Sequence, residues 1–200
     1  MNATPRAKLA VFVSGGGRSL ENLAAVIRRG ELEAEIALVV CNVAAAGALA
    51  RAQRLAIPSL VLDPERRLDA AEFSRRAFAA AEQAGVDLVV LAGFLRLLVI
   101  PEGWSGRVIN IHPSLLPKYG GKGFYGDRVH AAVLAAGERE SGCTVHLVTN
   151  EYDRGPILLQ RRVPVLPGDD VHTLAARVFE EEQRALPEAL RARLARRGPG

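Results

Sequence analysis

The sequence predicts a single α/β domain, in which helices cover both faces of a doubly wound, mostly parallel sheet with antiparallel strands at its C-terminal end. Apolar runs of strand length alternate with amphipathic stretches of helix length along most of the chain. The chain has 200 residues, 49% of them hydrophobic, which is enough for one domain with a large core and too few for two.

The first half of the chain alternates strand and helix signals in turn. The expected strands are 8–13, 36–40, 59–62 and 87–91. The expected helices are 19–29, 46–55 and 70–84. The run 87–91 is almost wholly apolar, as in a parallel strand that is buried on both faces.

The second half predicts one more parallel strand and then an antiparallel pair. The expected strands are 107–111, 143–149 and 157–165, with a turn at 150–156 between the last two. A helix over 127–136 follows a glycine-rich segment. A final helix runs from 171 to about 186, where we expect Pro187 to interrupt it. There is no internal repeat and no interdomain linker in the sequence.

The charge distribution argues against a nucleic-acid partner. The formal net charge is +4, from 26 Lys and Arg against 22 Asp and Glu. Four positive charges lie near the C-terminus, on Arg191, Arg193, Arg196 and Arg197, and the last ten residues contain no acid. The rest of the chain is balanced, so we interpret 191–200 as a solvated basic tail.

The remaining composition argues against secretion, a metal centre and a membrane span. Residues 1–6 lack the apolar segment of a signal peptide, which predicts a cytoplasmic protein. Cys41 and Cys143 lie in apolar runs without metal-ligand spacing, so we expect both in the core and no bound metal. The longest apolar runs have the length of strands.

The segment 108–117 is the strongest candidate for a catalytic site. Side chains alternate along a strand, so Asn110 and His112 point to the same side at its carboxyl end. Pro113 favours an extended backbone at His112. An amide donor beside an ionisable ring is suited to stabilising an oxyanion and moving a proton. A packed core histidine beside a turn-forming asparagine is the alternative.

The glycine-rich turn 14–19 is a candidate phosphate site, because it joins the first strand to the first helix. No Gly-Lys-Ser/Thr follows, so it is not a P-loop. Leu20 occupies the third glycine position of a dinucleotide fingerprint, and the second strand ends at Asn42 without an acidic residue. A phosphomonoester therefore fits better than NAD, and a tight connection alone is the alternative.

These residues resemble a known family. The motifs 110–117, 141–146 and 153–157 are similar to those of formyltransferases that use 10-formyltetrahydrofolate. With 14–20 and 91–98, the resemblance extends over nearly the whole chain and is specifically to the phosphoribosylglycinamide formyltransferases of purine synthesis. It implies one Rossmann-like formyltransferase domain over 1–200. Residues 1–100 would form a phosphate-binding half and 101–190 a catalytic and folate half.

The resemblance also implies roles for individual residues. The catalytic residues would be Asn110, His112 and Asp153. The phosphate and ribose of glycinamide ribonucleotide would contact Gly15, Gly16, Gly17, Arg18, Ser19 and Glu182. The folate co-substrate would contact Leu95, Arg96, Leu97, Leu98, Asn150 and Glu151, together with Asn110 and Asp153. The Leu116–Pro117 bond would be cis. The partners would be small molecules, without nucleic acid or membrane, and the protein a monomer or homodimer.

The spacing of side chains along a helix and along a strand indicates further candidate site residues. Glu182 shares an inward helical stripe with Val178, so its carboxylate needs either a ligand hydroxyl or a salt bridge to an arginine. Thr144 and His146 share one strand face and would lie behind the catalytic residues, with a packed core histidine as the alternative for His146. We expect His130 and His172 on the surface of helices.

The sequence departs from the commonest family pattern at 121–126, where a histidine-containing segment is usual, and at Arg154, where glycine is usual. These departures concern the shape of the loops and their substrate contacts.

The expected chemistry is direct attack of an amine on the formyl carbon. Asn110 would donate to the oxyanion, and protonated His112 would stabilise it and protonate the leaving nitrogen. Asp153 would raise the pKa of His112. Methionyl-tRNA formyltransferase and formyltetrahydrofolate deformylase share this trio, but they usually carry an extra domain, so chain length favours the small-substrate transferase. A phosphometabolite-binding module without catalysis is the non-enzymatic alternative.

Overall fold

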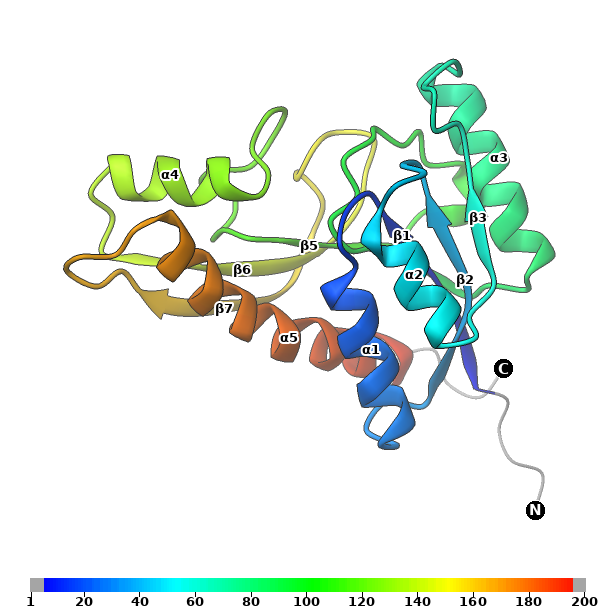
Figure 1. The fold of residues 1–200 in the computed structure, drawn as a ribbon, viewed down its shortest axis with the longest axis horizontal. Coiled ribbons are helices and arrows are strands. Elements are labelled where there is room, and N and C mark those ends of the chain that lie inside the picture. Colours follow the sequence, from blue (N-terminus) through cyan, green and yellow to red (C-terminus); the bar gives the residue numbers. More distant parts are fainter. Residues whose placement is uncertain (1–5, 196–200) are drawn as a thin grey trace.

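The computed structural model describes residues 6–195 and confirms the predicted fold class. Its strands form one sheet of seven, in the order β3-β2-β1-β4-β5-β6-β7 (Figure 1). The strands are β1 (Ala7–Val13), β2 (Ala34–Cys41), β3 (Ser59–Val61), β4 (Leu88–Leu91), β5 (Val108–His112), β6 (Glu140–Leu147) and β7 (Ile157–Pro164). Strands β1 to β5 pair in parallel, and β6 and β7 are antiparallel, as expected.

The order of the strands determines where a ligand can bind. The chain runs from β1 outward to β2 and β3, then returns to place β4 on the other side of β1. The connections after β1 and after β4 therefore leave in opposite directions, which opens a crevice at their carboxyl ends. Strand β5 lies beside β4 and ends at the same edge.

The helices form two layers, one on each face of the sheet (Figure 1). They are α1 (Arg18–Arg28), α2 (Gly47–Arg54), α3 (Ala70–Gln83), α4 (Asp127–Ala135) and α5 (Val171–Ala195), with a 3-10 turn at Glu102–Trp104. A hydrophobic core lies on each face of the sheet, and alternate residues of β1 point into one or the other. Leu9 and Val11 pack with α1, α2, α4 and α5, whereas Ala10 and Phe12 pack with α3 and Trp104.

The expected end of the last helix was wrong, because α5 continues through Pro187 to Ala195. Proline removes the N–H that would bond the carbonyl of Gln183, four residues earlier. The side chain of Asn22 on α1 replaces it, with its Nδ2 2.8 Å from that carbonyl oxygen. A contact between helices therefore compensates for the proline.

The interpretation of 191–200 as a solvated tail was wrong for the residues that are described. Arg191 Nε donates to the carbonyl of Glu31 at 2.7 Å, and Arg193 Nη2 donates to the carbonyl of Gly106 at 2.8 Å. Both arginines thus fasten α5 to neighbouring connections. Residues 196–197, the other two predicted tail arginines, lie outside the described part.

Both cysteines are buried with free thiols, as predicted. Burial raises the pKa of Cys143 to about 12, so its thiol is neutral and acts as a small apolar side chain. Over residues 6–195, no helix combines the length and the apolar character that crossing a membrane requires. The same residues contain no cluster of metal-binding side chains.

Candidate active site

A cavity of about 690 Å³ opens at the carboxyl ends of β1, β4 and β5, where the strand order predicts a binding site. Its walls come from the turn 15–19, the connection 92–95, the end of β5, the loop 121–127, residues 152–153 and one face of α5. Segments from the beginning, middle and end of the chain thus line one space.

The turn after β1 is held in place by Ser14. Its Oγ donates to Asn42 Oδ1 at 2.7 Å and accepts the backbone N–H of Leu95 at 2.9 Å, so it joins the connections that follow β1, β2 and β4. Gly17 has a φ of 79°, and a Cβ there would lie 2.7 Å from the Cβ of Ala48. The position therefore requires glycine on both backbone and steric grounds.

The backbone of the turn is open to the cavity. Gly15, Gly16, Gly17, Arg18 and Ser19 all line it, and a Cβ added at Gly15 or Gly16 would meet no atom within 4 Å. Helix α1 begins at Arg18 without a side-chain cap, so the first N–H groups of the helix lack a side-chain acceptor. This arrangement suits an anion.

The structure brings the three predicted catalytic side chains together. His112 Nδ1 lies 3.6 Å from Asp153 Oδ2, and Asn110 Nδ2 lies 3.5 Å from Asp153 Oδ1. All three line the cavity. Asp153 comes from the β6–β7 loop, whereas Asn110 and His112 project from the end of β5, as strand alternation predicts.

His112 is held as a neutral ring in the free protein. Its Nε2 lies 2.8 Å from the carbonyl oxygen of Tyr119, so Nε2 carries the proton and Nδ1 faces Asp153. Burial lowers the pKa of His112 more than the charge of Asp153 and the Tyr119 carbonyl raise it. The expectation of a raised pKa was therefore wrong, because desolvation outweighs the carboxylate.

Asp153 is the ionised group of the trio. Burial raises its pKa, but the combined effect of His146, His112 and the N–H of Gly121 is larger, so the net pKa is lowered. The N–H of Gly121 donates to Oδ2 at 2.8 Å, which attaches the loop 121–126 to the carboxylate. The φ of Asp153 is 53°, a left-handed conformation that aspartate tolerates better than most residues.

His146 is packed directly behind Asn110. Its Nδ1 is 2.8 Å from the carbonyl oxygen of Leu147, so Nδ1 carries the proton and Nε2 accepts from Asn110 Nδ2 at 3.0 Å. One amide hydrogen of Asn110 is thereby used and fixes the side chain. The other hydrogen makes a long hydrogen bond to Asp153 Oδ1 at 3.5 Å, the weaker of the two.

Glu182 lines the main cavity from α5. Burial raises its pKa to about 7, while the positive charge of Arg18 opposes that shift. Within residues 6–195 no hydrogen bond or ion pair reaches the Glu182 carboxylate, so the structure does not show the salt bridge that was one of the two expectations.

Comparison with known proteins gives the family. A family model described as "Formyl transferase" matches residues 7–190. The chain belongs to this family. The phosphoribosylglycinamide formyltransferase of Haemophilus influenzae is 36% identical over 182 residues, which cover 90% of this chain and 84% of that protein. The crystal structure of glycinamide ribonucleotide transformylase 1 from Symbiobacterium toebii superposes with a TM-score of 0.88 at 37% identity, covering 94% of this chain and 88% of that one.

Other relatives are much longer than this chain. The "Trifunctional purine biosynthetic protein adenosine-3" of Gallus gallus is 44% identical over 189 residues, which cover 94% of this chain but only 18% of that protein. The match is therefore to one part of such proteins. The family model and these relatives thus agree on the family to which the chain belongs.

The predicted folate residues of this chain divide between two spaces. Leu95 lines the main cavity, whereas Arg96, Leu97, Leu98 and Glu151 line an adjoining cavity of about 70 Å³. Both cavities share Phe94, Asn110, Tyr152 and Asp153, so they are continuous at the catalytic residues.

Two of the predicted folate side chains are occupied within the protein. Arg96 Nη1 donates to Asp63 Oδ2 at 2.6 Å, and its guanidinium lies over the ring of Phe73. Asn150 lines neither cavity, and its Oδ1 accepts the N–H of Ile100 at 2.7 Å. These two side chains shape the connections around the site.

Thr144 supports the loop that follows His112. Its Oγ1 donates to the carbonyl of Ser114 at 2.6 Å and accepts the N–H of Leu116 at 3.0 Å. The Leu116–Pro117 bond is cis, as predicted. Arg154, one of the two departures from the family pattern, is exposed and does not line either cavity.

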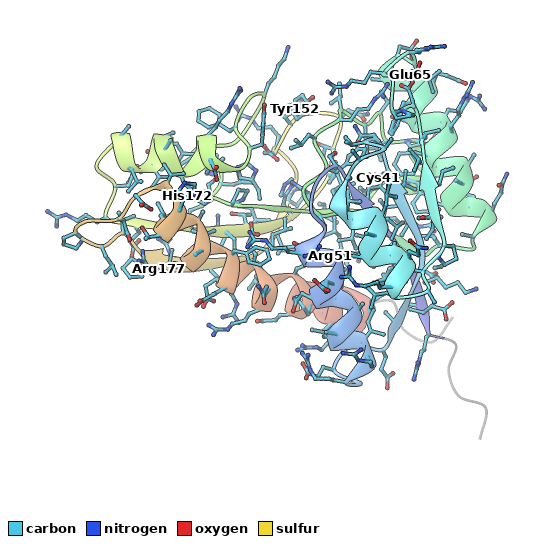
Figure 2. The ribbon with its side chains drawn as sticks, viewed as in Figure 1. Cys41, Arg51, Glu65, Tyr152, His172 and Arg177 are labelled. Atoms are coloured by element: carbon cyan, nitrogen blue, oxygen red, sulfur yellow. The ribbon has the colours of Figure 1, made fainter. Side chains whose placement is uncertain are left out.

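Sequence reasoning missed several residues of the cavity wall. His130 was expected on the surface, but it is buried, its Nδ1 has no partner within residues 6–195, and it lines the cavity. Its place on the buried stripe of α4, three residues before Val133, was the available signal. Tyr152 lies on the β6–β7 loop, above α5 in the view of Figure 2. Other aromatic wall residues are Phe124, Tyr125 and Phe179.

Proposed function

We propose that this formyltransferase transfers the formyl group of 10-formyltetrahydrofolate to the amine of glycinamide ribonucleotide. The observation that carries the proposal is one cavity that has Asn110, His112 and Asp153 on one wall and an open glycine turn at a helix N-terminus on another. Relatives named for this activity, such as that of Haemophilus influenzae, support the choice of substrate.

The chemistry begins with attack of the substrate amine on the formyl carbon, which breaks the carbonyl π bond and leaves an oxyanion. The amide hydrogen of Asn110 that makes the long bond to Asp153 donates to that oxyanion instead. Nδ1 of neutral His112 accepts a proton from the attacking nitrogen, and Asp153 stabilises the resulting imidazolium. When the oxyanion re-forms the carbonyl, the bond to the folate nitrogen breaks and the imidazolium protonates that nitrogen.

The two cavities suit the two substrates. The turn 15–19 would hold the phosphate, Glu182 a ribose hydroxyl, and the adjoining cavity beside Leu97 and Leu98 the folate. The steps proposed above use only side chains of this chain. We further propose one formyltransferase domain over 1–200, a cytoplasmic location, small-molecule partners without nucleic acid or membrane, and a monomer or homodimer.

A single-turnover assay tests the proposal. The enzyme is mixed with 10-formyltetrahydrofolate, with and without glycinamide ribonucleotide, and the formylated product and formate are measured. Formylated ribonucleotide is the expected product. Formate release without the acceptor would indicate a deformylase, and absence of any reaction would indicate a binding module. A parallel reaction with methionyl-tRNA tests the other transferase activity.

A further inference from the structure

Arg18 and Phe179 form a contact between two helices at the wall of the main cavity. Arg18 is the first residue of α1, and Phe179 lies in the middle of α5. The guanidinium carbon of Arg18 lies 3.7 Å from the centre of the Phe179 ring, and both side chains line the cavity with Glu182. A cation this close to a ring face is held by the ring quadrupole.

The hydrogen-bond donors of Arg18 remain free in this contact. Over residues 6–195, Arg18 makes neither a hydrogen bond nor an ion pair, and a guanidinium in contact with a ring face directs its N–H edges away from the ring. Arg107 also stacks on a ring, that of Trp104, but it donates to three carbonyls, those of Asp87, Gly103 and Val86. Stacking at Phe179 thus fixes Arg18 without occupying its donors.

The contact also keeps Arg18 apart from Glu182. The two charges are close enough for Arg18 to oppose the rise in the pKa of Glu182, yet no ion pair forms between them. An arginine on a flexible stem beside a partly buried carboxylate would gain by pairing with it. The ring of Phe179 offers Arg18 another position, so Glu182 and Arg18 can each meet a different group of one ligand.

We propose that Phe179 is a positioning residue for phosphate recognition, which holds the Arg18 guanidinium beside the turn 15–17 with its donors directed at the substrate phosphate. The inference rests on the proposed function for the identity of the substrate. Recognition of the phosphate itself does not depend on the proposed function, because any phosphomonoester bound at this turn would meet the same guanidinium.

The test compares four variants, namely Phe179→Leu, Phe179→Tyr, Arg18→Leu and the double variant Arg18→Leu/Phe179→Leu. Phe179→Leu is expected to raise the KM for glycinamide ribonucleotide about three- to thirtyfold, with little change in kcat or in the KM for 10-formyltetrahydrofolate. Phe179→Tyr keeps an aromatic face and should stay within about twofold of the wild-type KM. Thermal unfolding of each variant checks that it is folded.

The double variant decides whether Phe179 acts through Arg18. If it does, Phe179→Leu adds no further rise in KM once Arg18 is leucine. An equal rise in both backgrounds, or an equal rise in the KM for the formyl donor, would overturn the inference. So would a Phe179→Tyr variant as defective as Phe179→Leu.

Calorimetric binding of ribose 5-phosphate, compared with ribose, separates this inference from the proposed function. The wild-type protein is expected to bind the phosphorylated sugar more tightly, and Phe179→Leu should reduce that preference. If glycinamide ribonucleotide is not formylated but the preference depends on Phe179, the proposed function fails and the inference stands. If the wild-type protein shows no preference for the phosphorylated sugar, the inference is wrong.

Discussion

Replacing Asp153 by asparagine removes one negative charge from the side of His112 while keeping the size of the side chain. Asp153 Oδ2 lies 3.6 Å from His112 Nδ1, and both side chains are largely buried, with 12% and 6% of their surfaces exposed. The amide oxygen of an asparagine can still accept the N–H of Gly121, so the loop 121–126 should keep its position. The change therefore tests the charge of Asp153.

The size of the effect follows from this geometry. An opposite charge at such a distance typically shifts a pKa by about 1–3 units, and each unit corresponds to about 1.4 kcal/mol. Asp153 raises the pKa of His112 against the larger opposite effect of burial. Asp153→Asn should therefore lower that pKa further and destabilise the imidazolium by about 1.4–4 kcal/mol, which predicts a tenfold to thousandfold loss in kcat.

The pH profile of kcat/KM checks the direction of the predicted change in the pKa of His112. The neutral form of His112 is the base, so activity falls on the acid side as pH drops through the pKa of His112, which burial lowers. Asp153→Asn is expected to move this acid limb to lower pH, and NMR titration of the imidazole should follow it. Asp127→Asn is the matched control, because Asp127 lines the same cavity but its charge affects the pKa of His130. An acid limb that moves upward, or a kcat within twofold of wild type, would refute the reasoning.

Three further predictions follow from the site and from α5. Asn110→Ala should lower kcat about a hundred- to thousandfold with little change in KM; near-normal turnover would remove Asn110 from the oxyanion role. Glu182 has a pKa raised to about 7, so the folded protein loses stability as pH rises from 4.5 to 7. Thermal and urea unfolding should therefore show Glu182→Gln to be more stable than wild type at pH 8, by about 1–3 kcal/mol, and equal to it at pH 4. Asn22→Ala should lower the free energy of urea unfolding by about 0.5–1 kcal/mol, because the Gln183 carbonyl loses its donor. The same change should cost less beside Pro187→Ala, since a helix N–H then reaches that carbonyl, and equal costs in the two backgrounds would contradict the compensation.

The sequence predicted the fold class, the parallel pairing of the first five strands with an antiparallel pair after them, and the common side of Asn110 and His112. These features depend on local periodicity, which is visible in one dimension. The association of Asp153 with His112 came only from resemblance to a family, because their contact joins the β6–β7 loop to the end of β5 and depends on the pairing of β5 with β6. A turn carboxylate carries no local signal of what it will face.

The errors have a common physical origin in tertiary contacts. Pro187 was expected to end a helix because propensity describes an isolated segment, whereas the donor that compensates for it comes from Asn22 on α1. His130 was expected on the surface because the pattern of apolar residues along α4 does not show how deeply that helix packs against α5. Each error occurred where a group on another element supplies the partner or the cover.

The error about the state of His112 is informative about how this site works. The same burial that lowers the pKa of His112 raises the pKa of Glu182, so two ionisable groups of one cavity are held near their neutral forms. Asp153, which accepts a hydrogen bond from the loop 121–126, keeps its charge because its pKa is lowered. A neutral base beside a fixed carboxylate can accept a proton only when one is released, and it then becomes an imidazolium that the carboxylate stabilises. A permanently protonated His112 could stabilise an oxyanion but could not take the proton of the attacking amine. The lowered pKa therefore supports a cycle in which one ring serves first as base and then as acid.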